Sequence, residues 1–332
     1  MGPFGLGQAR DRSVREDQSA HADDLRALSG GWFGAVGVRL ALHCRVQEQS
    51  LGADGTLELC ALGEMASIHS SPGGTKFGED PELYDFARPP YPAALFDWLR
   101  DRAKLGPKSV CFEIGAGTGH ASLPILDTPV LHLRAIEPDA RLAEKLRRKA
   151  IGQDVANLAT IVSRFEDDTL ADDGYDFGFA AMSMHWLPRM KALTKARHAL
   201  KPSRHFAMWW NVYHNSAAPD AFGQTTAHLF SGVEQDPNAT DGRPAFALDV
   251  AARLGELRNA GFKDAEHALF EQQVTFSPES LSALYGTFSR VRMAPEETRD
   301  RLLSEAERIV RDQFGGSVTR TVSCSAFIGR KP

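Results

Sequence analysis

The segment from Val110 to Gly119 constrains the fold more than any other part of the chain. It reads V-C-F-E-I-G-A-G-T-G, a buried strand that runs straight into three alternate glycines. Glycine permits both the unusual φ angles of a tight strand-to-helix turn and the close approach of a ligand to the backbone. Open α/β sheets bind ligands at such a loop, beyond the carboxyl end of the first strand. The alternative is a glycine turn that holds no ligand.

From Ser109 onward, short β-rich runs alternate with longer helical runs, which is typical of βαβ units in a parallel sheet. We therefore expect an α/β fold with a Rossmann-like, seven-stranded, mostly parallel sheet, an antiparallel last strand and helices on both faces. The expected strands are 109–114, 130–136, 158–162, 175–181, 205–210, 264–270 and 317–328. The expected helices include 139–151, 190–200, 248–260 and one that Pro295 opens.

The chain divides by pattern into an extension and one domain. Residues 1–75 show no sustained period of 2 or 3.6, so we expect a poorly ordered N-terminal extension and hypothesise that the native chain starts at Met65. A single domain is expected over 76–332. Two insertions are expected in it, a lid at about 213–245, rich in Pro, Asn, Asp and Gly, and a helical insertion at about 277–314.

Composition excludes several classes of function. The net charge of -5 would repel phosphate backbones, and the basic run from Lys145 to Lys149 is expected to be a solvated helix face, so nucleic acid is not an expected partner. The four cysteines form no CxxC pair and show no zinc spacing, which predicts neither a metal site nor disulfides and fits a cytoplasmic protein. The longest apolar stretch near the start is too short to span a bilayer, so no membrane association is expected.

An acidic residue at the end of the second strand indicates what the glycine loop binds. Glu137 lies 22 residues after Gly115, where a carboxylate can accept hydrogen bonds from both hydroxyls of a ribose. The dinucleotide pattern GxGxxG fails, because its third position falls on His120 or Ser122. Glu113 would attract an ammonium group and repel a pyrophosphate. The pattern favours a cationic, amino-acid-bearing nucleoside cofactor, although Glu137 would also serve simply to cap a helix.

At this point the chain resembles the class I S-adenosylmethionine-dependent methyltransferases, in particular their small-molecule branch of the type 11/25 kind. The motifs that carry the resemblance are E-I-G-x-G-T-G at 113–119, Y-x-x-x-R-P-x-Y-P at 84–92, F-E-D at 165–167, H-W at 185–186 and L-K-P at 200–202. The likeness covers the chain from about Leu83 to the C-terminus and implies S-adenosyl-L-methionine as the cofactor.

The resemblance also implies a role for each matching position. Glu113, Gly115, Gly117 and Gly119 are expected to line the methionine half of the cofactor, Glu137 the ribose, and Phe165 and Glu166 the adenine. Two departures stand out. Arg164 replaces an Asp that in many relatives reaches the adenine amine, and Ser203-Arg204 replaces a glycine pair in a turn.

Methyl transfer from a sulfonium is a direct displacement, so the protein mainly aligns the reacting atoms and needs no nucleophile of its own. His185 is the candidate general base for the acceptor, because it is expected at the mouth of the sheet and titrates near neutrality. The alternative is that His185 only packs beside Trp186. Candidate substrate contacts are Tyr91, Trp186, Trp210 and Tyr285.

The sequence thus predicts an enzyme that methylates a small-molecule acceptor. One rival is an NAD(P)-dependent oxidoreductase, which the failed GxGxxG spacing disfavours. The other is a non-catalytic protein that binds S-adenosylmethionine. The acceptor, the methylated atom and the oligomeric state stay open, because function lies in the site and not in the scaffold.

Overall fold

The computed structural model describes residues 77–213, 219–230, 233 and 246–332. Within them the chain forms a seven-stranded sheet in the order β3-β2-β1-β4-β5-β7-β6. The strands are β1 (Val110–Ile114), β2 (His132–Glu137), β3 (Leu158–Val162), β4 (Tyr175–Ala181), β5 (Leu200–Val212), β6 (Lys263–Phe276) and β7 (Val318–Arg330). Strands β1 to β5 pair in parallel, and β7 runs antiparallel to both β5 and β6. The predicted fold class is confirmed.

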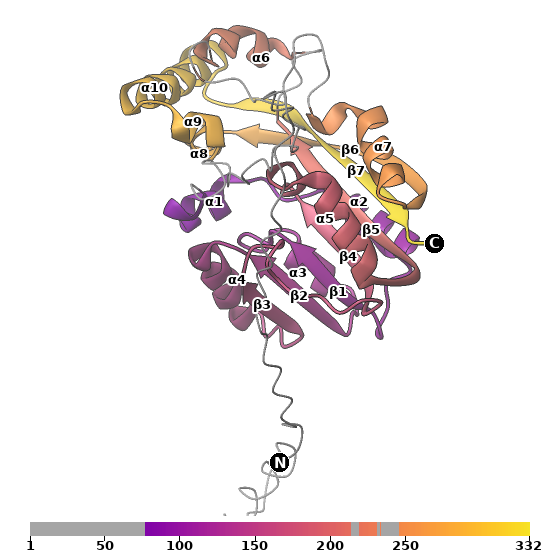
Figure 1. The fold of residues 1–332 in the computed structure, drawn as a ribbon. Helices are drawn as coiled ribbons and strands as arrows, with labels where there is room; N and C mark the ends of the chain where they lie inside the picture. Colours follow the sequence, from indigo (N-terminus) through magenta and orange to yellow (C-terminus); the bar gives the residue numbers. More distant parts are fainter. Residues whose placement is uncertain (1–76, 214–218, 231–232, 234–245) are drawn as a thin grey trace, which may run out of the picture. The chain divides into compact units, whose positions relative to one another are not determined.

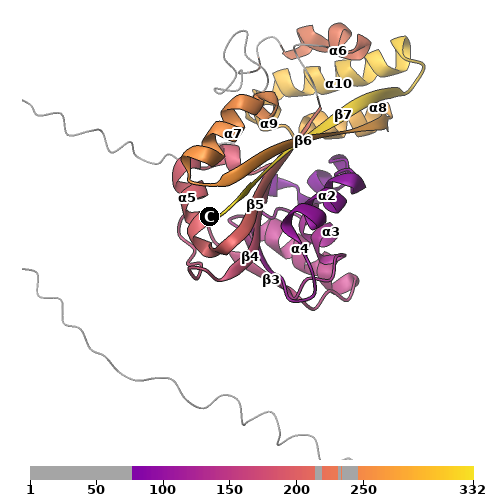
Figure 2. The same cartoon turned by 90° about the vertical axis from the view of Figure 1, so that its right-hand side faces the viewer.

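Helices cover both faces of this sheet (Figure 2). One face packs against α2 (Ala93–Ala103), α3 (Ser122–Leu126) and α4 (Ala140–Gly152), and the other packs against α5 (Arg189–Ala199) and α7 (Val250–Asn259). Successive strand residues point to opposite faces. The consequence is clearest in β5, where Trp209 packs on the α2 side and its neighbour Trp210 on the α5 side.

A helical cap lies beyond the carboxyl ends of the parallel strands (Figure 1). The last two strands extend past the rest of the sheet, and α8 (Pro278–Gly286), α9 (Ser289–Met293) and α10 (Glu296–Gln313) lie between them in sequence. Together with α6 (Ala221–Thr226) they bury a separate apolar cluster. Arg320 on β7, only 5% exposed, fastens α6 through two hydrogen bonds to Asp220, at 2.9 and 3.1 Å.

Two strands are longer than the sequence pattern predicts. Strand β5 starts at Leu200 and not at residue 205, and Ser203 takes a φ of +63° within it. Strand β6 runs on to Phe276, well past residue 270, because it continues as one edge of the hairpin that carries the cap. Much of the expected lid lies outside the described residues, as does the expected N-terminal extension.

No helix in the described part of the chain combines the length and the apolar character that crossing a membrane requires.

A substitution at Gly178 on β4 would test the packing at the centre of the sheet. Gly178 pairs with Phe112 on β1, and a Cβ at Gly178 would lie on top of the fully buried Phe112 ring. We expect Gly178→Ala to lower the free energy of unfolding by about 1–3 kcal/mol, because overpacking displaces the ring.

The matched control is Gly255→Ala, in the middle of α7, where an added Cβ meets no atom within 4 Å. This change should raise the free energy of unfolding by about 0.5–1 kcal/mol, since alanine favours the helix. Urea unfolding measures both variants. Equal stability of the two would contradict the packing described here.

Candidate active site

The glycine loop follows β1 and takes a shape that only glycine allows easily. Gly115, Gly117 and Gly119 all have positive φ angles, at 71°, 57° and 91°. A Cβ at Gly115 would lie 2.6 Å from the Cβ of Ser183, which follows β4, and one at Gly119 would collide with Leu146 of α4. Two of the glycines therefore let neighbouring elements approach closely, and all three allow the turn itself.

Two buried carboxylates flank this loop. Glu113 precedes it on β1 and is 1% exposed, and Glu137 ends β2 and is 5% exposed. The carboxylate of Glu137 accepts hydrogen bonds from the backbone N–H groups of Gly117, at 2.7 Å, and Asp139, at 2.9 Å. Burial raises the pKa of Glu137 to about 7 despite these two bonds.

Glu113 is the less satisfied of the two. Its Oε2 accepts a hydrogen bond from the Ser122 hydroxyl, whereas its Oε1 is buried with no partner among the described residues. Burial raises the pKa of Glu113 to about 8, and the nearby Glu137 carboxylate adds to the shift. An unpaired buried carboxylate oxygen costs free energy, so this position is suited to receive a donor from a bound cation.

Arg88 supplies a positive charge to the same cavity. The cavity is lined by Tyr84, Arg88, Pro89, Tyr91, Glu113, Gly115, Ala116, Gly117, Thr118, His120, Ala121, Ala181, Met182 and Tyr213. The guanidinium of Arg88 lies 5.3–5.4 Å from the ring centroids of Tyr84, Tyr213 and Phe288 and donates to the carbonyl of Thr287 at 3.0 Å. No carboxylate among the described residues pairs with it, and its Nε has no partner. Arg88 belongs to the motif at 84–92, but no role was predicted for it from the sequence.

The helix α1 (Pro81–Ala87), which precedes Arg88, is held against α4 by ion pairs. Lys149 lies 2.7 Å from the carboxylate of Asp85, and Lys145 pairs with Glu82. His120, at the end of the glycine loop, also contacts Asp85 at 3.1 Å. The expected solvated face of the basic run is therefore wrong for two of its lysines, because α1 covers them and they fix it beside the cavity.

The two residues predicted to flank adenine follow the end of β3. One side chain is buried, and the other is partly exposed. Phe165 is buried and stacks on Phe112, with ring centroids 6.4 Å apart, so only its backbone is left to face a ligand. Glu166 is partly exposed and accepts a hydrogen bond from Arg164 at 2.9 Å. Arg164 thus pairs with the carboxylate beside it.

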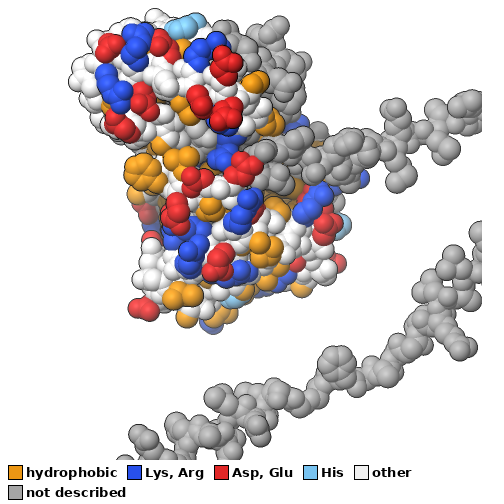
Figure 3. Space-filling view, turned by 90° about the vertical axis from the view of Figure 1, so that its left-hand side faces the viewer, with side chains coloured by type: hydrophobic (Ala, Val, Ile, Leu, Met, Phe, Trp, Pro, Cys, Tyr) orange, Lys and Arg blue, Asp and Glu red, His pale blue; other side chains and the backbone are white. Residues whose placement is uncertain are grey.

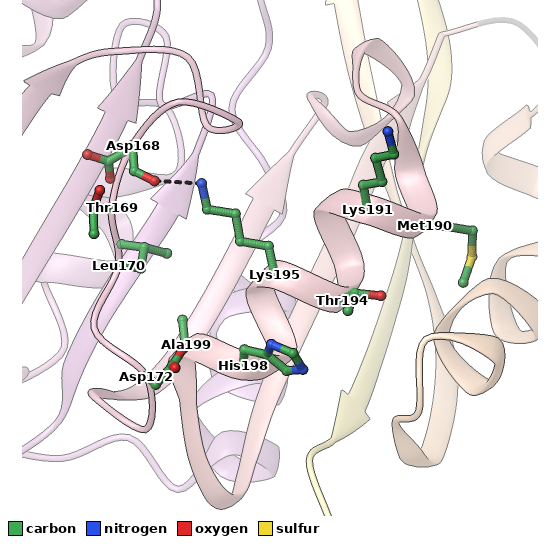
Figure 4. A pocket seen from close by; sticks show the side chains of 10 residues that line it. All are labelled: Asp168, Thr169, Leu170, Asp172, Met190, Lys191, Thr194, Lys195, His198 and Ala199. Carbon is green, nitrogen blue, oxygen red and sulfur yellow. Dashed lines mark hydrogen bonds between the residues drawn. The ribbon is translucent and has the colours of Figure 1, made fainter. Parts of the chain in front are cut away.

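Lys195 of α5 fixes the loop that follows β3. Its Nζ donates to the carbonyls of Phe165 and Asp168, each at 2.5 Å, and to that of Glu166 at 3.0 Å. Figure 4 shows this side chain reaching across to Asp168. The hollow drawn there has a volume of about 600 Å³ and lies between α5 and this loop. It is wider than the glycine-loop cavity, but none of its lining residues belongs to that loop, so its size does not identify it as the active site.

The four predicted substrate contacts do not come together. Tyr91 lines the glycine-loop cavity, with its ring 5.9 Å from that of Trp209. Tyr285 is buried in the cap and accepts a hydrogen bond from Arg320 at 3.4 Å. Trp186 and Trp210 lie on the α5 side of the sheet, next to His185.

His185 contacts both of these tryptophans. Its ring centroid is 4.8 Å from that of Trp186, and its Nδ1 accepts a hydrogen bond from the indole Nε1 of Trp210 at 3.0 Å. A neutral ring that accepts at Nδ1 carries its proton on Nε2. The general-base role of His185 stays a prediction, and in this arrangement the indole N–H of Trp210 occupies Nδ1.

Comparison with known proteins agrees with this geometry. A family profile described as "Methyltransferase domain" matches residues 112–203, from β1 to the start of β5. An uncharacterised methyltransferase of Schizosaccharomyces pombe is 24% identical over 238 residues, which cover 72% of this chain and 88% of the relative. An uncharacterised methyltransferase-like protein of the same yeast is 23% identical over 236 residues, 71% of this chain and 86% of the relative.

Among solved structures, a putative type II methyltransferase from Anaeromyxobacter dehalogenans has the same fold. It superposes with a TM-score of 0.52 at 21% identity, over 73% of this chain and 97% of that one. The profile matches the glycine loop and the ends of β2 and β4, which is the part of the chain where the cofactor motif was found. The chain therefore carries a methyltransferase domain, and the comparisons support an S-adenosylmethionine-dependent methyltransferase.

Proposed function

We propose that the enzyme transfers the methyl group of S-adenosylmethionine to a small-molecule acceptor by direct displacement. The observation that carries the proposal is the pair of buried carboxylates, Glu113 and Glu137, beside the glycine loop, together with Arg88, which pairs with no carboxylate among the described residues. S-adenosylmethionine supplies a methyl group already activated on a sulfonium, so the chain needs only to bind, orient and shield the reactants.

Each charged group in the cavity has a natural counterpart on the cofactor. Glu113 offers its unpaired Oε1 to the ammonium group, and Arg88 offers its guanidinium to the carboxylate at the other side of the same amino-acid moiety. Glu137 accepts the ribose hydroxyls. The backbone around Phe165, together with Glu166, borders the adenine.

A small acceptor suits the surroundings of this cavity. Aromatic rings of Tyr84, Tyr213 and Phe288 surround Arg88, and the cap lies beyond the same ends of the strands (Figure 1). On the face shown in Figure 3, acidic and basic side chains are interspersed and do not form one basic patch. A polyanion such as nucleic acid would need such a patch.

Glu137→Gln is the first test of the proposed function. S-adenosylmethionine, S-adenosylhomocysteine and NADH are titrated into the full chain, and formation of S-adenosylhomocysteine is followed with a panel of small acceptors. We expect the first two ligands to bind and NADH not to bind. The variant should bind them about 10–100-fold more weakly, because hydrogen bonds to a charged group are worth roughly 1.5–3 kcal/mol.

The matched control is Glu144→Gln, on the exposed surface of α4, which should leave binding unchanged. Unaltered affinity in Glu137→Gln would remove the ribose assignment. Tight binding of S-adenosylmethionine without turnover of any acceptor would contradict methyl transfer to a small molecule.

Cofactor binding should depend on pH because both carboxyls have raised pKa values. In the free protein burial raises these pKa values to about 7 for Glu137 and about 8 for Glu113, so both are partly protonated near neutrality. A ligand that needs them ionised lowers both pKa values and releases protons. Affinity for S-adenosylhomocysteine should therefore rise between pH 6 and pH 8, by about tenfold from Glu137 alone. Calorimetry in buffers of different ionisation enthalpy measures the released protons. Affinity that falls with pH would show that the neutral carboxyls bind the ligand.

Arg88→Leu tests whether Arg88 binds the carboxylate of the cofactor. The variant should bind S-adenosylhomocysteine roughly tenfold or more weakly, because a charge-assisted hydrogen bond is lost. Methylthioadenosine, which lacks the amino-acid group, should bind wild type and variant equally, and Arg88→Lys should lose less than Arg88→Leu. An equal loss for both ligands would show that Arg88 only shapes the cavity.

A further inference from the structure

The hydrogen bond between Trp210 and His185 fixes the state of a histidine at the mouth of the sheet. Trp210 lies on β5, is 3% exposed, and packs against Phe246 and Phe327 with ring centroids 5.3 and 6.1 Å away. These contacts hold the indole in one orientation. Its Nε1 lies 3.0 Å from Nδ1 of His185.

An indole N–H can only donate, so the nitrogen facing it must present a lone pair. The neutral imidazole then carries its proton on Nε2. Protonating Nδ1 would set two N–H groups against each other inside the core and would leave the indole of Trp210 without an acceptor. His185 is thus held neutral, with Nε2 as a donor.

Charged groups of the adjoining helices surround the aromatic ring beside His185. Phe246, 6.1 Å from His185, lies beneath Arg189 of α5 and Arg253 of α7, whose guanidinium carbons are 5.1 and 3.6 Å from its centroid. Both arginines share a single carboxylate, that of Glu256, each at 2.9 Å. Asp249 also acts on Arg253, so two carboxylates balance the two arginines, and the state of His185 depends on its bond with Trp210.

We propose that Trp210 is a positioning residue that keeps His185 in the Nε2–H form, so that His185 acts as a hydrogen-bond donor and not as a general base. The link to catalysis rests on the proposed function. In the transfer, the acceptor atom uses its own lone pair to bond the methyl carbon, and the electron pair of the broken carbon–sulfur bond stays on sulfur. Any proton on the acceptor leaves to water. The acceptors that fit are those whose reacting atom has a free lone pair near neutral pH.

Nitrogen NMR of the full chain with labelled histidine, in the presence of S-adenosylhomocysteine, tests the proposal. The signals of His185 are assigned by their loss in His185→Gln. We expect Nδ1 to be the unprotonated nitrogen and Nε2 the protonated one, with no change between pH 6 and pH 8. A His185 ring that is protonated on Nδ1, or that gains a proton within this range, would overturn the proposal.

Trp210→Phe is the second measurement, since phenylalanine keeps an aromatic ring and removes the N–H. In this variant His185 should show both tautomers and begin to titrate, whereas the other histidines in the same spectrum should not change. A role of Trp210 in packing alone would leave the tautomer of His185 as in the wild type. The spectra need no methyl acceptor, so failure of the small-molecule proposal would be seen separately, in the turnover assay.

Discussion

Burial of the Glu113 carboxylate is the constraint on which the cofactor site depends. One oxygen is paired with Ser122 and the other has no partner in the described structure, at a place where water is almost excluded. Such a group is tolerated only where its neutral form is favoured or a cation arrives. The glycine loop, Glu137 and Arg88 lie around this position, and in the proposed function the positive charge of the ligand would pair with the Glu113 carboxylate.

Two adjacent residues of β5 connect the two sides of the sheet. Because neighbouring side chains on a strand point in opposite directions, Trp209 contacts Tyr91 on the α2 side of the sheet, and Trp210 contacts His185 on the α5 side. Trp209, which packs beside Tyr91, and Trp210, which bonds His185, therefore lie on opposite faces of the same strand.

Local patterns were enough to predict the sheet and the glycine loop. A buried strand followed by alternate glycines, and an acidic residue at the end of the next strand, are readable within a few residues. The partners of Arg88, the ion pair of Asp85 with Lys149 and the bond from Trp210 to His185 were not readable, because each joins residues that only the fold brings together. The sequence shows that residue 185 is a histidine, but it does not show that Trp210 donates a hydrogen bond to its ring.

The cap has its own apolar core and joins the sheet through long β6 and β7, far along the chain from the glycine loop. Apart from Thr287 and Phe288, which contact Arg88, substitutions among its residues are expected to leave the packing of β1 and β4 and the carboxylates at the strand ends unchanged. Because of this division, residues of the cap can change during evolution while the glycine loop and its flanking carboxylates are kept. Divergence in this family is thus expected to accumulate in the cap faster than in the sheet.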